Sequence, residues 1–392
     1  MTPNASLSNL FQPIKVGNLT LSHRVVLAPL TRFRATNDFV PLVPLVKEYY
    51  SQRASMPGSL LITEAAIIHR RAGGYANVPG IWNDAQIEAW KEIVDAIHNK
   101  GSYIFLQVVG IGRIADPSVL HSEDGSESYD VVSASALPMA GKPIPRPLSV
   151  EEIKQYAEYF ATAAKNAVEK AGFDGVEIHG ANGYLIEQFL KEASNKRTDS
   201  YGGSPENRSK FALEIVDAVV DAVGPTKTGL RLSPWNTDQE TGDRDPIPTY
   251  SHLVRELKKF HPALAYIHVI DPRIDGGHTD RDEASIGNRS NQFIRDIWTE
   301  GNSGRRLISA GGYDLKTGTE LADAKGDLVA YGRRFISNPD LPYRLKHDIP
   351  LNAYDRSTFY CPGSLDPKGF TDYPSASADL IATAAERAST SL

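Results

Sequence analysis

The sequence predicts a single α/β domain, a (β/α)8 or TIM barrel of eight parallel strands that alternate with helices over residues 1–392. Two observations support this prediction. Eight short apolar runs recur along the chain with helical patterns between them, and continuous apolar runs are typical of parallel strands buried on both faces. No Gly-x-Gly-x-x-Gly motif follows the first run, which disfavours an open dinucleotide-binding sheet.

The predicted strands cover residues 24–28, 59–63, 103–108, 175–179, 228–232, 266–270, 307–310 and 328–331. Three of the helices between them have clear start signals. Asn83 with Gln86, and Ser149 with Glu152, have the spacing of a capping box, in which two side chains satisfy free backbone N–H groups at a helix start. Pro205 follows a serine, as is typical of the first position of a helix.

The loops after the strands carry the catalytic groups in a barrel of this kind. Three of them are long and polar, namely residues 110–148, 235–249 and 272–288. Long loops without regular structure are often lids, so we expect these loops to cap the carboxyl-terminal face of the barrel. Residues 130–133 predict a small hairpin, and residues 375–392 predict a C-terminal tail with a terminal helix.

Composition limits the kind of partner. The formal net charge of −6 and the pI near 6.0 argue against a nucleic-acid partner, which needs a concentrated basic surface. The single cysteine, Cys361, excludes an intramolecular disulfide and fits a reducing compartment. No apolar leader and no run of about 20 apolar residues occurs, so we expect a cytoplasmic protein that does not enter a membrane. Either a monomer or a homodimer fits.

Three polar residues cluster directly after the fourth predicted strand. His179 and Asn182 can each donate one hydrogen bond, so together they can polarise a carbonyl or phenolate oxygen and make a conjugated β carbon accept hydride. Tyr184 comes two residues later, and with an ordinary pKa of about 10 it can act as a general acid at neutral pH. On spacing alone, a structural histidine followed by an Asn-Gly turn is the more frequent explanation.

Arg231 lies within the apolar fifth strand. A charge buried there has to be paired or to face a ligand, because an isolated charge in a protein interior is costly. An anionic cofactor ring or a phosphate would neutralise it, and so would an internal glutamate such as Glu64 or Glu177. The sequence leaves these two explanations even.

Glycines follow the seventh and eighth strands, where many barrels bind a phosphate group. Gly311 and Gly312 allow a close backbone approach, and Gly332 precedes Arg333, whose guanidinium can bind phosphate oxygens. A phosphate site is therefore predicted. No metal site is predicted, because the ten histidines are scattered and no His-x-His follows the first strand. No strand ends at a lysine, which argues against Schiff-base chemistry.

Five longer strings occur at residues 10–18 (LFQPIKVGN), 28–34 (APLTRFR), 179–185 (HGANGYL), 195–204 (NKRTDSYGGS) and 331–340 (YGRRFISNPD). In this order, and over almost the whole chain, they resemble the Old Yellow Enzyme family of FMN-dependent ene-reductases. The resemblance is strongest to the fungal branch, which includes reductases and isomerases of alkaloid biosynthesis.

The resemblance implies that FMN binds across the barrel mouth and that NADPH enters the same pocket as hydride donor. The residues implied at FMN are Pro29, Leu30, Thr31, Ala65, Gln107, Arg231, Gly311, Gly312, Gly332 and Arg333. Thr31 would bond the flavin O4, Arg231 would stabilise the anionic reduced ring, and the glycines with Arg333 would hold the phosphate. The residues implied at the substrate are His179, Asn182, Tyr184, Tyr75, Val109, Phe359 and Tyr360.

The chain departs from the pattern of this family in three places. Val109 stands where many relatives have tryptophan, so we expect a smaller pocket wall and an altered substrate orientation. Gly312 stands where several relatives have asparagine, and Ala65 where several have glycine, which affects the expected flavin contacts. Tyr184 is retained, whereas fungal isomerases of the family often have phenylalanine there, and this favours net reduction.

By this resemblance, flavin N5 would deliver hydride to the β carbon of a small activated alkene, such as an enone, enal or nitroalkene, and Tyr184 would protonate the α carbon. A flavin-dependent isomerase, or an alkaloid-pathway reductase of the same fold, is the alternative within the family. A metal-dependent barrel hydrolase is the alternative from another class, and it predicts a colourless protein with bound metal.

Overall fold

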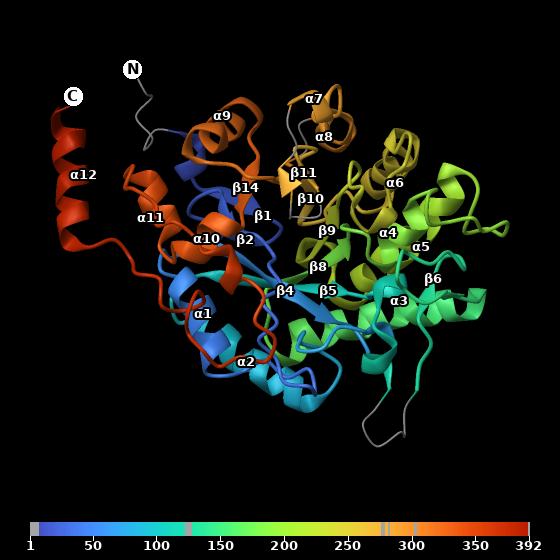
Figure 1. The fold of residues 1–392 in the computed structure, drawn as a ribbon. Coiled ribbons are helices and arrows are strands. Elements are labelled where there is room, and N and C mark those ends of the chain that lie inside the picture. The colour runs from blue at the N-terminus through green and yellow to red at the C-terminus, as the bar shows by residue number, and fades with distance from the viewer. Residues whose placement is uncertain (1–7, 122–127, 276–278, 281–282, 302–303, 391–392) are drawn as a thin grey trace.

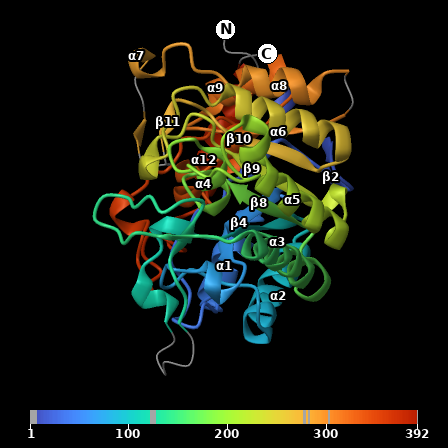
Figure 2. The same cartoon turned by 90° about the vertical axis from the view of Figure 1, so that its right-hand side faces the viewer.

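The computed structural model describes residues 8–121, 128–275, 279–280, 283–301 and 304–390. Eight parallel strands close into a barrel and follow one another around it in chain order. They are β3 (Val25–Leu27), β4 (Leu60–Ile67), β5 (Tyr103–Val109), β8 (Gly175–Gly180), β9 (Thr228–Leu232), β10 (Tyr266–Ile270), β13 (Leu307–Ala310) and β14 (Leu328–Tyr331). Figures 1 and 2 show helices around these strands in two views. The predicted eight-stranded α/β barrel is confirmed.

The second strand is longer than predicted. It was expected over residues 59–63, but β4 continues to Ile67. Its register against β5 shifts around Glu64, whose backbone N–H donates a hydrogen bond of 2.8 Å to the Tyr50 hydroxyl. A side chain from another element thus replaces a bond of the strand ladder, as at a β-bulge. Because this contact is tertiary, the local sequence pattern does not reveal it.

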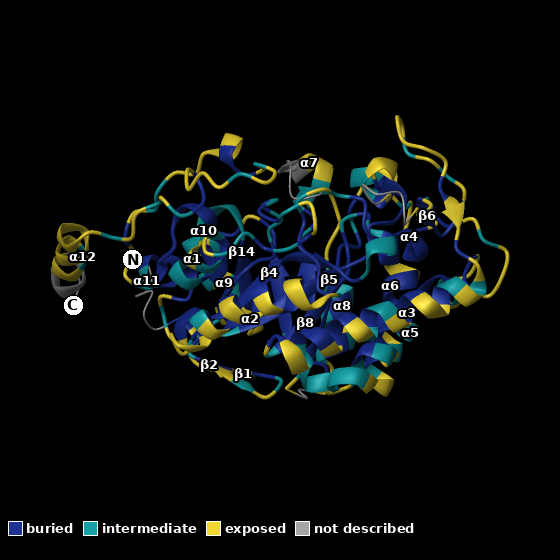
Figure 3. Ribbon diagram, turned by 90° about the horizontal axis from the view of Figure 1, so that it is seen from below, coloured by how far each residue is buried: buried dark blue, intermediate teal, exposed yellow. Residues whose placement is uncertain are grey.

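The helices are α1 (Leu45–Arg53), α2 (Asp84–His98), α3 (Val150–Lys165), α4 (Leu185–Leu190), α5 (Pro205–Val223), α6 (Ile247–Phe260), α7 (Glu283–Ile286), α8 (Gln292–Thr299), α9 (Leu315–Lys325), α10 (Arg333–Ser337), α11 (Leu341–Lys346) and α12 (Ala378–Thr390). The capping boxes predicted at Asn83 and Ser149 are both present, and Ser204 caps α5 ahead of Pro205. In Figure 3 the helices expose their outer faces, while the strands between them are buried.

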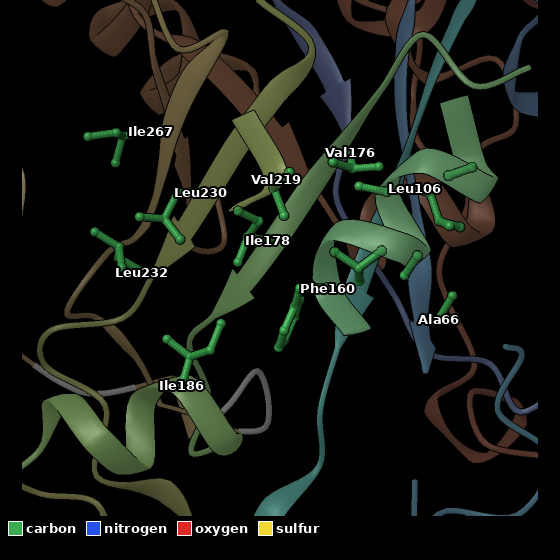
Figure 4. Close-up of a cluster of buried hydrophobic side chains, with 14 of the residues drawn as sticks. Ala66, Leu106, Phe160, Val176, Ile178, Ile186, Val219, Leu230, Leu232 and Ile267 are labelled. Carbon is green, nitrogen blue, oxygen red and sulfur yellow. The ribbon is translucent and has the colours of Figure 1, made fainter. Parts of the chain in front are cut away.

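The main hydrophobic core lies between the outer face of the barrel and the helices. Figure 4 shows part of it, where Val176 and Ile178 of β8 lie near Phe160 of α3 and Val219 of α5. All four side chains are fully buried. Burial of each such side chain stabilises the fold by about 1.5–3 kcal/mol, so the strands are held firmly and the residues at their ends have fixed positions.

Several small elements complete the fold. The hairpin of β1 (Ile14–Val16) and β2 (Leu19–Leu21) packs against residues of the barrel strands. β11 (Ile274–Asp275) pairs antiparallel with β12 (Thr279–Asp280). The predicted terminal helix is present as α12, which stands apart from the barrel in Figure 1.

The hairpin predicted at residues 130–133 is wrong. β6 (Val132–Ser133) pairs with β7 (Arg146–Pro147), but the two strands are parallel. The long connection between them lets the chain return in the same direction, which a tight hairpin turn cannot do. None of the helices in the part of the chain that the structure describes is long and apolar enough to span a membrane.

Candidate functional site

The carboxyl-terminal mouth of the barrel opens into a cavity of about 670 Å³. All the predicted site residues line it except Ala65 and Val109. The cavity therefore brings together groups from β5, β8, β9, β10, β13 and β14 and from the loop after β3, as expected for the mouth of a barrel.

Ala65 and Val109 lie in a buried apolar cluster beside the cavity. Val109 is only 1% exposed, and Tyr75 and Tyr184 pack against the same cluster while themselves lining the cavity. The prediction that Val109 forms the pocket wall is therefore corrected. Because these aromatic side chains line the cavity and it does not, residue 109 supports the wall from behind.

His179 is the penultimate residue of β8 and is 3% exposed. Burial, together with the positive charge of Arg231 and the nearby His268, lowers its pKa well below the usual value. The ring is therefore neutral at physiological pH, with one nitrogen carrying a proton and one free to accept. Its Nδ1 is buried and has no hydrogen-bond partner among the described residues.

Asn182 lies in a tight turn between β8 and α4. Both Asn182 and Gly183 have a left-handed backbone, with φ of 56° and 79°. Asparagine and glycine are the residues that adopt this conformation most readily, which explains the local sequence. The Asn182 Oδ1 is buried without a partner among the described residues. His179 and Asn182 thus both face the cavity with unused hydrogen-bonding capacity.

A buried carboxyl group, that of Glu187 in α4, holds this turn in place. The Asn182 N–H donates to the Ser233 hydroxyl over 2.8 Å, and that hydroxyl donates to Glu187 Oε1 over 2.6 Å. The Gly183 N–H donates to Glu187 Oε2 over 2.6 Å. Sequence reasoning missed Glu187, although a glutamate inside the apolar string LIEQFL was a usable signal.

Tyr184 is the first residue after the turn and stays protonated. Burial, with the nearby Tyr75 and Tyr360 hydroxyls and Asp238, raises its pKa far above the usual value. The Tyr75 ring lies edge-on to that of Tyr184, with the centroids 6.4 Å apart, and burial raises the pKa of Tyr75 to about 12. The Tyr184 ring lies 4.9 Å from the ring of His179, centroid to centroid. A proton donor therefore stands beside the two hydrogen-bonding groups.

Deeper in the barrel, Glu177 orients the polar side chains around it. Its two carboxylate oxygens are bonded to different partners: the Gln107 Nε2 donates to Oε1 over 2.7 Å, and Oε2 lies 2.8 Å from the His268 Nδ1. Burial lowers the pKa of His268, so its neutral ring donates to Glu177. A carboxylate only accepts hydrogen bonds, so Gln107 has to direct its NH2 group at Glu177, which leaves its carbonyl oxygen for the cavity.

The surroundings of Arg231 are consistent with both explanations of its buried charge, a neighbouring glutamate and an anionic ligand. Burial lowers its pKa, and the nearby carboxylate of Glu177 raises it. Within the described residues no ion pair joins Arg231 to Glu64 or Glu177, and its Nε has no hydrogen-bond partner. Because Arg231 also lines the cavity, it can still bind an anionic group there.

Gly311 and Gly312, which follow β13, are glycines for different structural reasons. A Cβ on Gly311 would lie 2.5 Å from the Asp271 side chain, so packing alone requires glycine there. A Cβ on Gly312 would instead lie 3.8 Å from the Arg333 Nη2, in a space bordered by the guanidinium. The Gly312 backbone and Arg333 therefore face each other across the cavity lining, as a phosphate cradle requires.

Further lining residues were not predicted. They include Phe33, Asp238, Gln239, Tyr313 and Tyr354. Most lie in loops whose course is set by tertiary contacts. Among the described residues, no group of three or more His, Cys, Asp or Glu side chains could hold a metal ion.

The comparisons with known proteins agree with this geometry. Residues 9–352 match the profile of the NADH:flavin oxidoreductase / NADH oxidase family. The chain is 50% identical over 372 residues to the chanoclavine-I aldehyde reductase fgaOx3 of Penicillium roqueforti (strain FM164), covering 94% of this chain and 96% of that protein.

Two solved structures are similar over nearly their full length. The Old Yellow Enzyme from Pichia sp. AKU4542 is 38% identical, with a TM-score of 0.82 and 94% of both chains covered. Morphinone reductase in complex with tetrahydroNAD is 39% identical, with a TM-score of 0.82, 95% of this chain and 98% of that chain covered. The cofactors are FMN and a nicotinamide coenzyme. The chain belongs to the NADH:flavin oxidoreductase family, in its Old Yellow Enzyme group, and is an oxidoreductase.

Proposed function

We propose that this protein is an ene-reductase that uses NADPH and FMN to reduce the C=C bond of a small activated alkene, such as an enone, enal or nitroalkene. One observation carries the proposal. His179 and Asn182 face the cavity with unused hydrogen-bonding groups, directly beside a tyrosine that is kept protonated. That set of groups suits an alkene conjugated to an oxygen.

The chain's own residues fit FMN. Pro29, Leu30 and Thr31 line the cavity along the β3 loop, where they would lie against the ring. Gln107 offers an acceptor and Arg231 offers donors, which match the alternating N–H and C=O groups of the pyrimidine edge. Gly312 and Arg333 would hold the phosphate. When bound, FMN supplies the hydride that the β carbon receives.

The remaining residues act on the substrate. His179, as a neutral ring, donates one hydrogen bond to the substrate oxygen, and the NH2 group of Asn182, a residue that lines the same cavity, donates another. This polarises the conjugated C=C bond. Tyr184 then gives its hydroxyl proton to the α carbon. Tyr75 packs edge-on against Tyr184 and helps to fix the position of its ring, and solvent returns the proton to Tyr184 after each turnover.

Tyr184→Phe tests the proposal directly. The variant should still bind FMN and be reduced by NADPH at the parent rate, while reduction of 2-cyclohexenone slows by about 100-fold or more, the usual contribution of a general acid. Tyr103→Phe is the matched control, because Tyr103 begins β5 at the far end of the barrel. Stopped-flow absorbance separates the two half-reactions. Unchanged enone reduction in Tyr184→Phe would contradict the proposal.

The same samples separate the alternatives. An isomerase converts its substrate without consuming NADPH, which product analysis against NADPH absorbance would reveal. A metal-dependent hydrolase would be colourless, whereas an FMN protein is yellow because it absorbs blue light.

A further inference from the structure

We propose that the substrate side of the cavity contains a subsite for a cationic amine, so that the preferred alkene carries a protonated or quaternary nitrogen. This rests on the proposed ene-reductase function and names the substrate class more narrowly. Two independent features support it, a continuous aromatic wall and a carboxylate presented by a strained loop.

The aromatic wall consists of Tyr184, Tyr75, Phe33, Tyr360, Phe359 and Tyr354, all of which line the cavity. Each ring contacts the next in this order, with centroid distances of 6.4, 6.3, 5.8, 6.4 and 5.5 Å. The first four contacts are edge-on. An aromatic face attracts a cation within about 6 Å of its centroid, and several such faces around one space recognise alkylated ammonium groups.

Asp238 is the one carboxylate among the described residues that line this cavity. It is half-buried, in the loop after β9. Among the described residues its one side-chain hydrogen bond is local, with the Gln239 N–H donating to Oδ1 over 3.0 Å, and no ion pair there neutralises it. Its charge reaches the wall, because it is among the causes that raise the pKa of both Tyr75 and Tyr184. A cation between them would complete the arrangement.

The loop that carries Asp238 is held in one conformation by its neighbours. Gln239 and Glu240 both have a φ of 56°, which is unfavourable for residues other than glycine. Arg113 stabilises this conformation by donating to both carbonyls, over 2.7 Å to Gln239 and 3.0 Å to Glu240. The Asp238 N–H in turn donates to Asp275 over 3.1 Å. Such strain persists where the surrounding structure enforces it, and it concentrates at ligand sites.

The arginines that line the cavity do not cancel the preference of this subsite for a cation. Arg32 uses its guanidinium on the backbone carbonyls of residues 358, 359 and 369. Arg32 also lies over the Phe359 ring at 5.8 Å, and Arg333 over the Tyr354 ring at 5.9 Å. Arg231 lies on the barrel floor and Arg333 beside Gly312, where the proposed function assigns anionic parts of FMN. The fourth arginine of the lining, Arg334, lies near the carboxylate of Asp314. The end of the wall formed by Tyr184 and Tyr75, which the charge of Asp238 reaches, is therefore the part that suits a cation and disfavours an anion.

Matched pairs of enals test the inference. One member of each pair carries a trimethylammonium group at a stated distance from the carbonyl, and the other has carbon in place of nitrogen, so that only the charge differs. We expect the FMN-loaded parent to prefer the cationic member by about tenfold or more in kcat/KM, for at least one distance. In Asp238→Asn this ratio should fall to about one. Glu240→Gln is the control, because Glu240 is an exposed acid of the same loop that does not line the cavity.

The outcomes separate the two proposals. If the parent reduces neither member of any pair, the proposed function fails. If it reduces both members equally well at every distance, the ene-reductase function stands and the amine subsite is wrong. If Asp238→Asn slows both members by the same factor, or Glu240→Gln abolishes the preference as well, Asp238 does not recognise a cation. Weaker competitive inhibition of Asp238→Asn by benzyltrimethylammonium would support the subsite without any turnover.

Discussion

Replacing Glu177 with glutamine should destabilise the protein and weaken FMN binding, whereas the same change at Glu64 should be harmless near neutral pH. Both carboxyl groups are buried, at 0% and 2% exposure. Although burial raises the pKa of Glu177, His268, Arg231 and Gln107 bring it below the usual value, so Glu177 is ionised. Burial instead raises the pKa of Glu64 to about 7. Glutamine imitates a protonated carboxyl group far better than an ionised one.

The magnitude for Glu177→Gln follows from its two short hydrogen bonds, of 2.7 and 2.8 Å. A glutamine oxygen can replace one of them, while its NH2 group meets the donor that formed the other. A hydrogen bond to a charged group contributes about 1.5–3 kcal/mol, so the loss is on the order of 3 kcal/mol. For a chain of 392 residues the unfolding entropy is about 0.8 kcal/mol/K, so Tm should fall by about 4 °C.

The two sites have opposite pH dependence. A lowered folded-state pKa, as at Glu177, gives stability that is present above the unfolded pKa and is lost as pH falls through the folded pKa. The raised pKa of Glu64 means that the folded state binds its proton more tightly. The parent therefore loses about 3 kcal/mol from this group as pH rises from about 4.5 to above 7. Glu64→Gln should match the parent at pH 5 and exceed it in stability at pH 8.

Calorimetry of the apoproteins between pH 5 and pH 8, with FMN fluorescence titrations, measures both effects. Glu177→Gln should bind FMN about three- to tenfold more weakly, because Gln107 can then turn its amide and lose one hydrogen bond to the ring. A Tm for Glu177→Gln within about 1 °C of the parent at pH 7 would refute the ionised carboxylate. So would identical pH profiles for the Glu177 and Glu64 variants.

Three further changes have clear expected outcomes. His179→Ala should weaken phenol binding by about tenfold or more, seen as loss of the long-wavelength absorbance with FMN; in the parent, the lowered pKa of His179 predicts that only ionisation of the phenol itself changes the affinity between pH 6 and 8. Val109→Trp should lower stability by about 1–3 kcal/mol in chemical denaturation, because a fully buried site behind Tyr75 and Tyr184 would be overpacked. Arg32→Met should speed proteolysis between residues 354 and 374, because the carbonyls of residues 358, 359 and 369 lose their donor.

The barrel could be predicted because its signals are local. Strands buried on both faces read as apolar runs, and the helix caps at Asn83, Ser149 and Ser204 involve residues three positions apart. The extension of β4 through Glu64 and the parallel pairing of β6 with β7 depend on contacts between distant segments. Neither can be derived from a local pattern.

The residues of the candidate site also divide into those that the sequence could predict and those that depend on distant contacts. Residues at strand ends, such as His179 and Arg231, were predictable because the closed barrel brings all strand ends to one mouth. Phe33 and Asp238 were missed because loops determine their placement, and Phe33 has a left-handed φ of 57° that its sequence does not suggest. Val109 was misplaced because the tyrosines that line the cavity beside it come from other segments.

A single strand links the two sides of the site. Glu177 and His179 are two residues apart on β8, so their side chains point to the same inner face of the barrel. Glu177 pairs in register with Gln107 of β5, and His179 with Arg231 of β9. Glu177 therefore orients the floor that suits the cofactor. In the proposed function His179 would bind the substrate oxygen, with burial and the charge of Arg231 keeping its ring neutral. A register slip of one residue would remove both groups from the barrel interior at once, so folding and catalytic geometry depend on the same strand pairing.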